Sequence, residues 1–253
     1  MSRNKNAAQQ EKKTWLVPGI VVLVAALLIG FVLYMNNAGS NDEAAPESGA
    51  NDAQQGPQAV EQQQEEPPFD LTSVETRDDS DPLAVGPVDA PVGLVVFSDY
   101  QCVYCAKWSN DTLPAMMKHV DAGDLRIEWR DANVYGPASE RAARAAYAAA
   151  LQGQYVEYHH ALFDGGEIRS EAELSDDSLI ALASDIGLDT DKFASDLNAE
   201  ETSQVVAENA QLGQELGVYS TPSFLLGGQP LMGAQPTEVF EDAFEQALAE
   251  ADK

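Results

Sequence analysis

The stretch that decides the fold is VVFSDYQCVYC, residues 95–105. It opens inside an apolar run, 93–98, whose β-branched and aromatic residues predict a buried strand. It closes on Cys102 and Cys105, and helix-compatible sequence follows directly. Residues 125–130 then alternate apolar and polar side chains, which predicts a second strand. The order strand, cysteine pair, helix, strand favours a right-handed parallel βαβ unit.

The rest of the chain up to its C-terminus is predicted to form a helical section followed by a hairpin and a last helix. Two apolar runs on either side of Gly227 and Gly228 predict the β-hairpin, and the last helix begins near Pro236. The expected helices of the middle section are 137–151, 154–164, 176–186, 193–197 and 200–216. The sequence therefore predicts an α/β fold with a helical insertion.

The two cysteines carry the chemistry that the sequence predicts. A cysteine at a helix N-terminus meets the positive end of the helix dipole and unpaired N–H groups, so the pKa of Cys102 should fall below about 8.5. The resulting thiolate attacks disulfides. Cys105, one turn later and more buried, can then resolve the mixed disulfide.

Four other interpretations of the cysteine pair remain open at this point. A structural disulfide would close a loop too small to restrict the unfolded chain strongly. A zinc site would need about two more ligands, and the only histidines are His119, His159 and His160. Attachment of c-type haem requires a histidine where Ala106 stands. The spacing could also arise by chance.

Three stretches resemble the DsbA-like thiol:disulfide oxidoreductases. Residues 95–105 look like the active site of that family, residues 81–91 like its lead-in, and residues 218–224 like its second signature. The resemblance covers about residues 81–253. It implies a thioredoxin fold, βαβ–ββα, with an inserted helical subdomain at about 137–200.

The resemblance also implies which residues form the site. It places a cis peptide bond at Thr221–Pro222, facing the cysteine pair, and these two residues are expected to line the groove for an extended client. Tyr104 is expected to shape the client-binding surface. Asp99 either supports the thiolate by proton transfer or caps the helix. Many family members carry Pro or His between the cysteines, where a histidine would help to hold the thiolate, whereas this chain has Val103 and Tyr104. We expect no cofactor besides the redox-active disulfide Cys102–Cys105, and no metal.

The N-terminal part predicts a membrane anchor. Residues 15–35 are apolar and would span about 31 Å as a helix, close to the hydrocarbon core of about 30 Å. Basic residues precede the run, so residues 1–14 should stay in the cytoplasm and the remainder should lie outside, in a single-pass arrangement. The alternative is a cleaved signal peptide, although no Ala-x-Ala site follows the run.

Residues 36–82 predict a disordered linker, because Gln, Glu, Asp, Ala and Pro dominate and few apolar side chains are available for burial. The catalytic domain is then expected at 83–253. The chain has 14 basic and 42 acidic residues, a formal charge of −28, which argues against binding to nucleic acid.

These features together predict a membrane-tethered, extracytoplasmic enzyme that introduces disulfides into secreted proteins. Its partners would be reduced or unfolded secreted proteins and a quinone-linked membrane protein that re-oxidises the cysteine pair. The alternatives are a disulfide reductase or isomerase for specific clients, a non-catalytic holding module, and a metal carrier.

Overall fold

The computed structural model describes residues 71–251. The predicted cytoplasmic segment 1–14, the predicted anchor 15–35 and residues 36–70 of the predicted linker lie outside the described residues. Among the helices of residues 71–251, none combines the length and the apolar character needed to cross a membrane.

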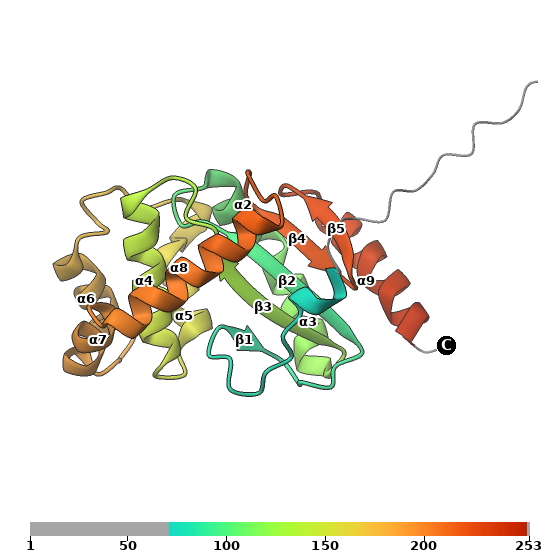
Figure 1. Ribbon diagram of the computed structural model, residues 1–253, viewed down its shortest axis with the longest axis horizontal. Coiled ribbons are helices and arrows are strands. Elements are labelled where there is room, and N and C mark those ends of the chain that lie inside the picture. Colours follow the sequence, from blue (N-terminus) through green and yellow to red (C-terminus); the bar gives the residue numbers. More distant parts are fainter. Residues whose placement is uncertain (1–70, 252–253) are drawn as a thin grey trace, which may run out of the picture. The chain divides into compact units, whose positions relative to one another are not determined.

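The described chain forms one mixed sheet with the strand order β1-β3-β2-β4-β5 (Figure 1). The two central strands, β2 (Val92–Ser98) and β3 (Leu125–Asp131), are parallel and completely buried. The neighbours are antiparallel: β1 (Ala84–Val85) pairs with β3, and β4 (Ser223–Leu226) pairs with both β2 and β5 (Gln229–Met232). The predicted strands and hairpin are therefore confirmed, whereas the two-residue strand β1 was not predicted.

Two helices, not one, connect β2 to β3. Helix α2 (Val103–Asp111) starts directly after Cys102, and helix α3 (Leu113–Ala122) follows after a single residue, Thr112. Helix α3 ends at Gly123, whose φ of 86° is in the left-handed region that favours glycine. The crossover carries the chain back to the start of β3, so both parallel strands end at the same edge of the sheet.

The section between β3 and β4 is helical, as predicted. It contains α4 (Pro137–Ala150), α5 (Tyr155–Leu162), a short 3-10 turn η2 (Asp164–Gly166), α6 (Asp176–Asp185), α7 (Thr190–Leu197) and α8 (Glu200–Glu215). The small side chains of eight buried alanines let α4 lie at the centre of this section, in contact with α5, α6, α7 and α8. The last helix, α9 (Thr237–Ala251), packs against α3 and the sheet.

The two faces of the sheet are covered differently. The main hydrophobic core lies on one face, where Leu94, Val96, Ile127 and Trp129 pack against the helices. On the other face, a small cluster of Val74, Val95, Phe97 and Leu225 lies under α8 and the 3-10 helix η1 (Leu71–Val74) (Figure 1).

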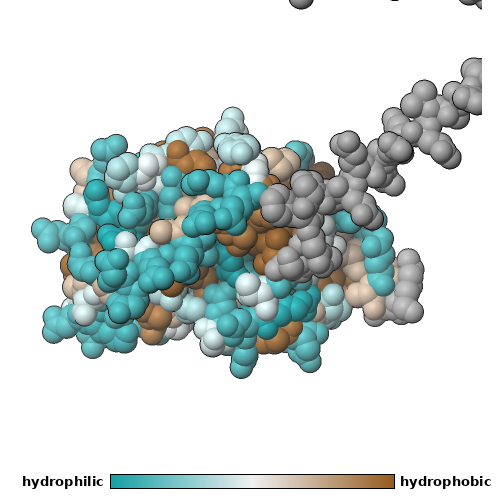
Figure 2. All heavy atoms as spheres, in the orientation of Figure 1, coloured by the Kyte–Doolittle hydropathy of each residue, from teal (hydrophilic) through white to brown (hydrophobic). Residues whose placement is uncertain are grey.

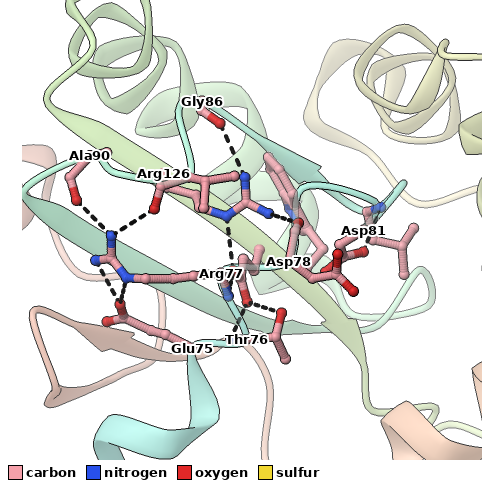
Figure 3. A network of polar contacts seen from close by, with 12 residues as sticks. Glu75, Thr76, Arg77, Asp78, Asp81, Gly86, Ala90 and Arg126 are labelled. Atoms are coloured by element: carbon pink, nitrogen blue, oxygen red, sulfur yellow. Dashed lines mark hydrogen bonds and ion pairs between the residues drawn. The ribbon is translucent and has the colours of Figure 1, made fainter.

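Residues 75–82 continue from η1 across the same face of the sheet and contact β3 through polar groups. The backbone N–H groups of Thr76 and Arg77 donate to the buried Glu128 carboxylate at 3.0 and 2.9 Å. Arg126, itself paired with Glu128, donates to the backbone carbonyl of Asp78 at 2.5 Å (Figure 3). On the same strand, Arg130 forms ion pairs with both Glu128 and Asp81 at 2.9 Å.

These contacts correct the linker boundary predicted at residue 82. Residues 71–82 form part of the folded domain, because β3 presents three charged side chains to this face and the segment supplies their partners. The acidic and polar composition that suggested a solvated spacer serves here to neutralise buried arginines.

Candidate active site

Cys102 and Cys105 lie where the carboxyl end of β2 meets the first turn of α2. Cys102 is the N-cap residue of α2 with extended backbone angles, and its carbonyl accepts from the N–H groups of Cys105 and Ala106 at 3.0 and 3.1 Å. Both cysteines are free thiols in this structure. Cys105 is buried as predicted, but Cys102 is only 1 % exposed, so the predicted difference in burial is small.

The environment separates the pKa values of the two thiols. A hydrogen bond from the Cys105 thiol, the Thr221 side chain and the N–H groups of Cys105 and Tyr104 lower the pKa of Cys102 to about 6, against the effect of burial. Burial and the neighbouring Cys102 raise the pKa of Cys105 well above its usual value. Cys102 is therefore the thiolate and Cys105 the proton-holding thiol near neutral pH.

The loop before β4 faces the cysteine pair. The Thr221–Pro222 peptide bond is cis, as the resemblance implied. The Cys102 thiol donates to the carbonyl oxygen of Thr221 at 3.2 Å, and the carbonyl of Pro222 accepts from the N–H of Gly233 at 2.8 Å. The Thr221 hydroxyl is buried beside the Cys102 sulfur, and it is a side-chain donor that lowers the pKa of Cys102. The loop thus offers a backbone acceptor for the Cys102 thiol and a hydroxyl donor for its thiolate.

Asp99 joins the elements around the site. Its buried carboxylate accepts from the N–H of Gln101 at 2.7 Å, the hydroxyl of Ser139 at 2.6 Å and the N–H of Tyr135 at 3.1 Å. These donors belong to the start of α2, the start of α4 and the loop after β3. Of the two roles predicted for Asp99, the contacts correspond to holding the helix start and the neighbouring loop.

Tyr135 is a site residue that the sequence analysis did not identify. The charge on the Cys102 sulfur, followed by burial, raises the pKa of Tyr135, so the phenol lies close enough to Cys102 to interact with it. A neutral phenol is a hydrogen-bond donor, so a role for Tyr135 in stabilising the thiolate is a hypothesis that substitution can test. Tyr135 lies 30 positions beyond Cys105 in an irregular loop, so no local motif reveals it.

Exposed apolar side chains flank the site. Tyr104 is 61 % exposed and Val103 is also exposed, while Tyr135 and Tyr219 present aromatic rings to solvent from the loops after β3 and before β4. Tyr104 is therefore exposed beside the cysteine pair, and its contribution to client binding stays a prediction. These side chains give the surface around Cys102 an apolar character that suits unfolded chains.

Two of the three histidines form hydrogen bonds away from the cysteine pair. His119 bonds to Glu241 at 2.7 Å, and the buried His159 bonds to Tyr100 and Ser109 at 3.1 and 2.9 Å. Across residues 71–251, no group of three or more His, Cys, Asp or Glu side chains is arranged to hold a metal ion.

The comparisons with known proteins agree with this geometry. The family model described as "Thioredoxin" matches residues 78–246. Among solved structures, a thioredoxin-like oxidoreductase from Silicibacter pomeroyi is 30 % identical, with a TM-score of 0.55 over 67 % of this chain and 98 % of that one. The thiol-disulfide exchange protein α-DsbA2 from Wolbachia pipientis is 26 % identical, with a TM-score of 0.56 over 70 % of this chain and 96 % of that one. Oxidised BdbD from Bacillus subtilis, at 23 % identity and a TM-score of 0.60, covers 66 % of this chain and 92 % of that one and shows the same fold.

Curated relatives include much longer proteins. The Na(+)/H(+) antiporter NhaA 3 of Salinispora tropica is 30 % identical over 169 residues, which are 66 % of this chain and 24 % of the antiporter. The chain thus spans about a quarter of the length of the antiporters it matches. A probable disulfide bond formation protein D of Bacillus cereus is 23 % identical over 57 % of this chain and 69 % of that protein. The predicted thioredoxin fold is confirmed, and the chain belongs to the thioredoxin family, with the DsbA-type thiol-disulfide oxidoreductases among its structural relatives.

Proposed function

We propose that this chain is a thiol:disulfide oxidoreductase that exchanges a disulfide with cysteine-containing client proteins through Cys102 and Cys105. The observation that carries the proposal is the difference in pKa between the Cys102 and Cys105 thiols. Cys102, with a pKa of about 6, lies at a helix start beside the Thr221 hydroxyl, and Cys105 stays protonated one turn later. A nucleophile and a resolving thiol of this kind are what disulfide exchange requires.

In the oxidising direction, a client thiolate attacks the Cys102 sulfur of the Cys102–Cys105 disulfide. A client–Cys102 bond forms, the Cys102–Cys105 bond breaks, and Cys105 leaves as a thiolate and takes up a proton. A second client thiolate then attacks the client sulfur of this mixed disulfide and releases Cys102 as a thiolate. The client has lost two electrons and the cysteine pair has gained them.

The properties of Cys102 favour this direction. A thiolate that is stable at neutral pH is a good leaving group and stabilises the reduced form of the pair, which makes the disulfide more oxidising. Tyr135 and the Thr221 hydroxyl contribute here in place of the histidine that the Val103–Tyr104 dipeptide lacks. A client in extended form would bind along the backbone before Pro222 by strand addition.

The proposal includes the cellular setting. The apolar residues 15–35 and the preceding basic cluster support a single-pass anchor with the enzyme outside the cytoplasm, where disulfides persist. The clients would be reduced secreted proteins, and a quinone-linked membrane protein would return the cysteine pair to the disulfide.

Two measurements on the purified protein test the function and its direction. The reduction potential of the Cys102–Cys105 pair, equilibrated against glutathione, should lie above the value of about −270 mV typical of thioredoxin. The oxidised protein should also convert a reduced, unfolded client to its disulfide form at one equivalent per turnover. A potential at or below that of thioredoxin would favour the reductase, and activity only on a scrambled client would favour the isomerase. No exchange in any assay would remove the oxidoreductase proposal.

A further inference from the structure

A cavity of about 380 Å³ lies on the face of the sheet opposite the main core. Its walls are largely apolar and come from the C-terminal end of α8, the loop that follows this helix, and the strands β4 and β5. Figure 2 shows hydrophobic surface beside the C-terminal end of α8. A second, more open hollow lies against the last turns of α8, and Glu215 and Tyr219 line both. The two hollows therefore meet at these two side chains, and we call them together the α8 depression.

Glu215 makes the α8 depression electrically negative. It is the only charged side chain among the described residues that line either hollow. Its carboxylate accepts from the side-chain amide of Gln211 at 2.7 Å and forms no ion pair with any residue of 71–251. Glu215 is also the last residue of α8, where the helix dipole favours a positive charge, and the last turn of α8 contains no basic residue. The carboxylate and the negative helix end thus act on the same place without a cation.

Tyr219 gives the α8 depression an aromatic wall. Its side chain is 81 % exposed, yet the ring is turned back toward the end of α8. The Cε2 atom of the ring lies 3.9 Å from the position that a Cβ on Gly217 would occupy. An exposed ring beside a carboxylate is an arrangement that suits a guanidinium group, which can stack on the ring and pair with the carboxylate at once.

The α8 depression is close to the reacting sulfur. The Thr221 carbonyl lies 3.2 Å from the sulfur of Cys102, and Tyr219 precedes Thr221 by two positions, a reach of at most about 7 Å. Ser223, on the other side of Pro222, also lines the cavity. A client that binds in extended form along this loop therefore brings a side chain about two positions from its cysteine to the α8 depression.

We propose that the α8 depression is a subsite for a cationic client side chain, arginine above all, about two positions from the client cysteine. The inference rests on the proposed function and names the kind of client segment that Cys102 prefers. The guanidinium pairs with Glu215 and stacks on Tyr219, while the apolar walls take the methylene stem. The cavity has room for such a side chain, since about 150 Å³ already admits benzene. The formal charge of −28 acts in the same direction by attracting basic segments.

Peptides that differ in one charge test the proposal on full-length Cys105→Ala protein. Each peptide carries one cysteine as its thiopyridyl disulfide, with arginine or its uncharged isostere citrulline two positions before or after the cysteine. The Cys102 thiolate attacks the peptide sulfur, a Cys102–peptide disulfide forms, and the bond to the thiopyridyl sulfur breaks. The released thiopyridone is followed by absorbance, which gives the second-order rate constant for each peptide.

Glu215→Gln should slow the reaction of an arginine peptide about threefold at low salt, the effect of one partly exposed ion pair, and should not change the rate of its citrulline counterpart. The difference should disappear in about 1 M salt, where the Debye length is about 3 Å. Glu208→Gln is the matched control. Glu208 is exposed two turns earlier on α8 and likewise accepts from the glutamine four positions before it, but it lines neither hollow. Its substitution should leave all rates unchanged.

Three results would overturn the subsite. Glu215→Gln could leave the rates of the arginine peptides unchanged, or it could slow the arginine and citrulline peptides equally. An equal loss in Glu208→Gln would show that the overall negative charge, and not the α8 depression, attracts the peptide. In each of these cases Cys102 still reacts, so the proposed function stands. No reaction of Cys102 with any peptide would remove the proposed function and the subsite together.

Discussion

The thiol of Cys102 donates a hydrogen bond to the backbone carbonyl of Thr221, 119 positions later in the sequence, at a distance of 3.2 Å. This contact joins the start of α2 to the loop before β4. It uses a backbone atom, so its geometry depends on how the loop is held and not on the identity of the Thr221 side chain. A client that approaches Cys102 must therefore meet a surface formed from both segments.

The first prediction concerns the order of reactivity of the two thiols. In the reduced protein, iodoacetamide should modify Cys102 with a pH midpoint of about 6 and should modify Cys105 far more slowly, because the pKa of Cys105 is raised well above its usual value. In the Cys105→Ala variant the midpoint should rise, because the Cys105 thiol makes the largest contribution to the low pKa of Cys102. Mass spectrometry of quenched samples measures both rates, and faster modification of Cys105 in the wild-type protein would reverse the assignment.

The second prediction isolates Tyr135. Tyr135→Phe removes the phenolic donor but keeps the ring, so the pKa of Cys102 should rise by about half a pH unit at this partly exposed site. Tyr104→Phe is the matched control, because Tyr104 is similarly exposed and lies two positions after Cys102 in the sequence. Thiolate absorbance at 240 nm against pH gives the midpoint in each variant. Equal midpoints in wild type and Tyr135→Phe would show that the phenol does not stabilise the thiolate.

The third prediction tests the polar cover of β3. Glu128→Ala removes the shared partner of Arg126 and Arg130, whose side chains are both 5 % exposed, and of the Thr76 and Arg77 N–H groups. Breaking a buried ion pair typically costs about 3–5 kcal/mol. Urea unfolding should show a loss of this size, whereas Glu245→Ala on the exposed face of α9 should change the stability by less than about 0.5 kcal/mol. A small loss for Glu128→Ala would mean that residues 75–82 contribute little to the fold.

The fourth prediction concerns the pH dependence of stability. Asp131, at the carboxyl end of β3, is buried and its carboxylate has no hydrogen-bond partner within residues 71–251. Burial, followed by the negative charge of Asp99, raises the pKa of Asp131 to about 7. Because this pKa is higher in the folded than in the unfolded state, stability should fall as the pH rises from about 4 to about 7.

Asp131→Asn removes this ionisation. The variant should be more stable than the wild type above pH 7, by up to about 4 kcal/mol, and the difference should disappear near pH 4. Asp121→Asn at an exposed position is the control and should not change the pH profile. Thermal unfolding at a series of pH values measures the stability of each variant. A wild type that is more stable than Asp131→Asn at pH 8 would contradict the prediction.

The sequence predicted the parts of the fold that local patterns determine. The run 93–98 and the alternation at 125–130 identified the two parallel strands, and the spacing of Cys102 and Cys105 identified the redox pair, because each pattern lies within one element. The end of the linker was predicted at residue 82, too far along the chain, for a physical reason. Residues 75–82 are held by buried arginines on β3, and a composition rich in acidic residues looks the same whether its partners are water or arginine.

Local sequence patterns also failed to reveal the parts of the active site that come from distant segments. Tyr135 and Asp99 meet near Cys102 only because β2 and β3 are parallel and end at the same edge of the sheet. Nothing in the sequence around Tyr135 distinguishes it from Tyr104 or Tyr219. Thr221 and Pro222 were identified beforehand only through the resemblance to a known family.

The central claim is that Cys102, and not Cys105, forms the mixed disulfide with a client, and that Cys105 resolves this intermediate when exchange runs in the reducing direction. The most direct measurement is the covalent complex itself, captured in full-length Cys105→Ala protein incubated with an oxidised client and resolved on a non-reducing gel. Cys105→Ala should accumulate a client complex that dithiothreitol releases, with the crosslink at Cys102 by mass spectrometry, and Cys102→Ala should accumulate none. A complex through Cys105, or no complex with either variant while both remain folded, would contradict the account.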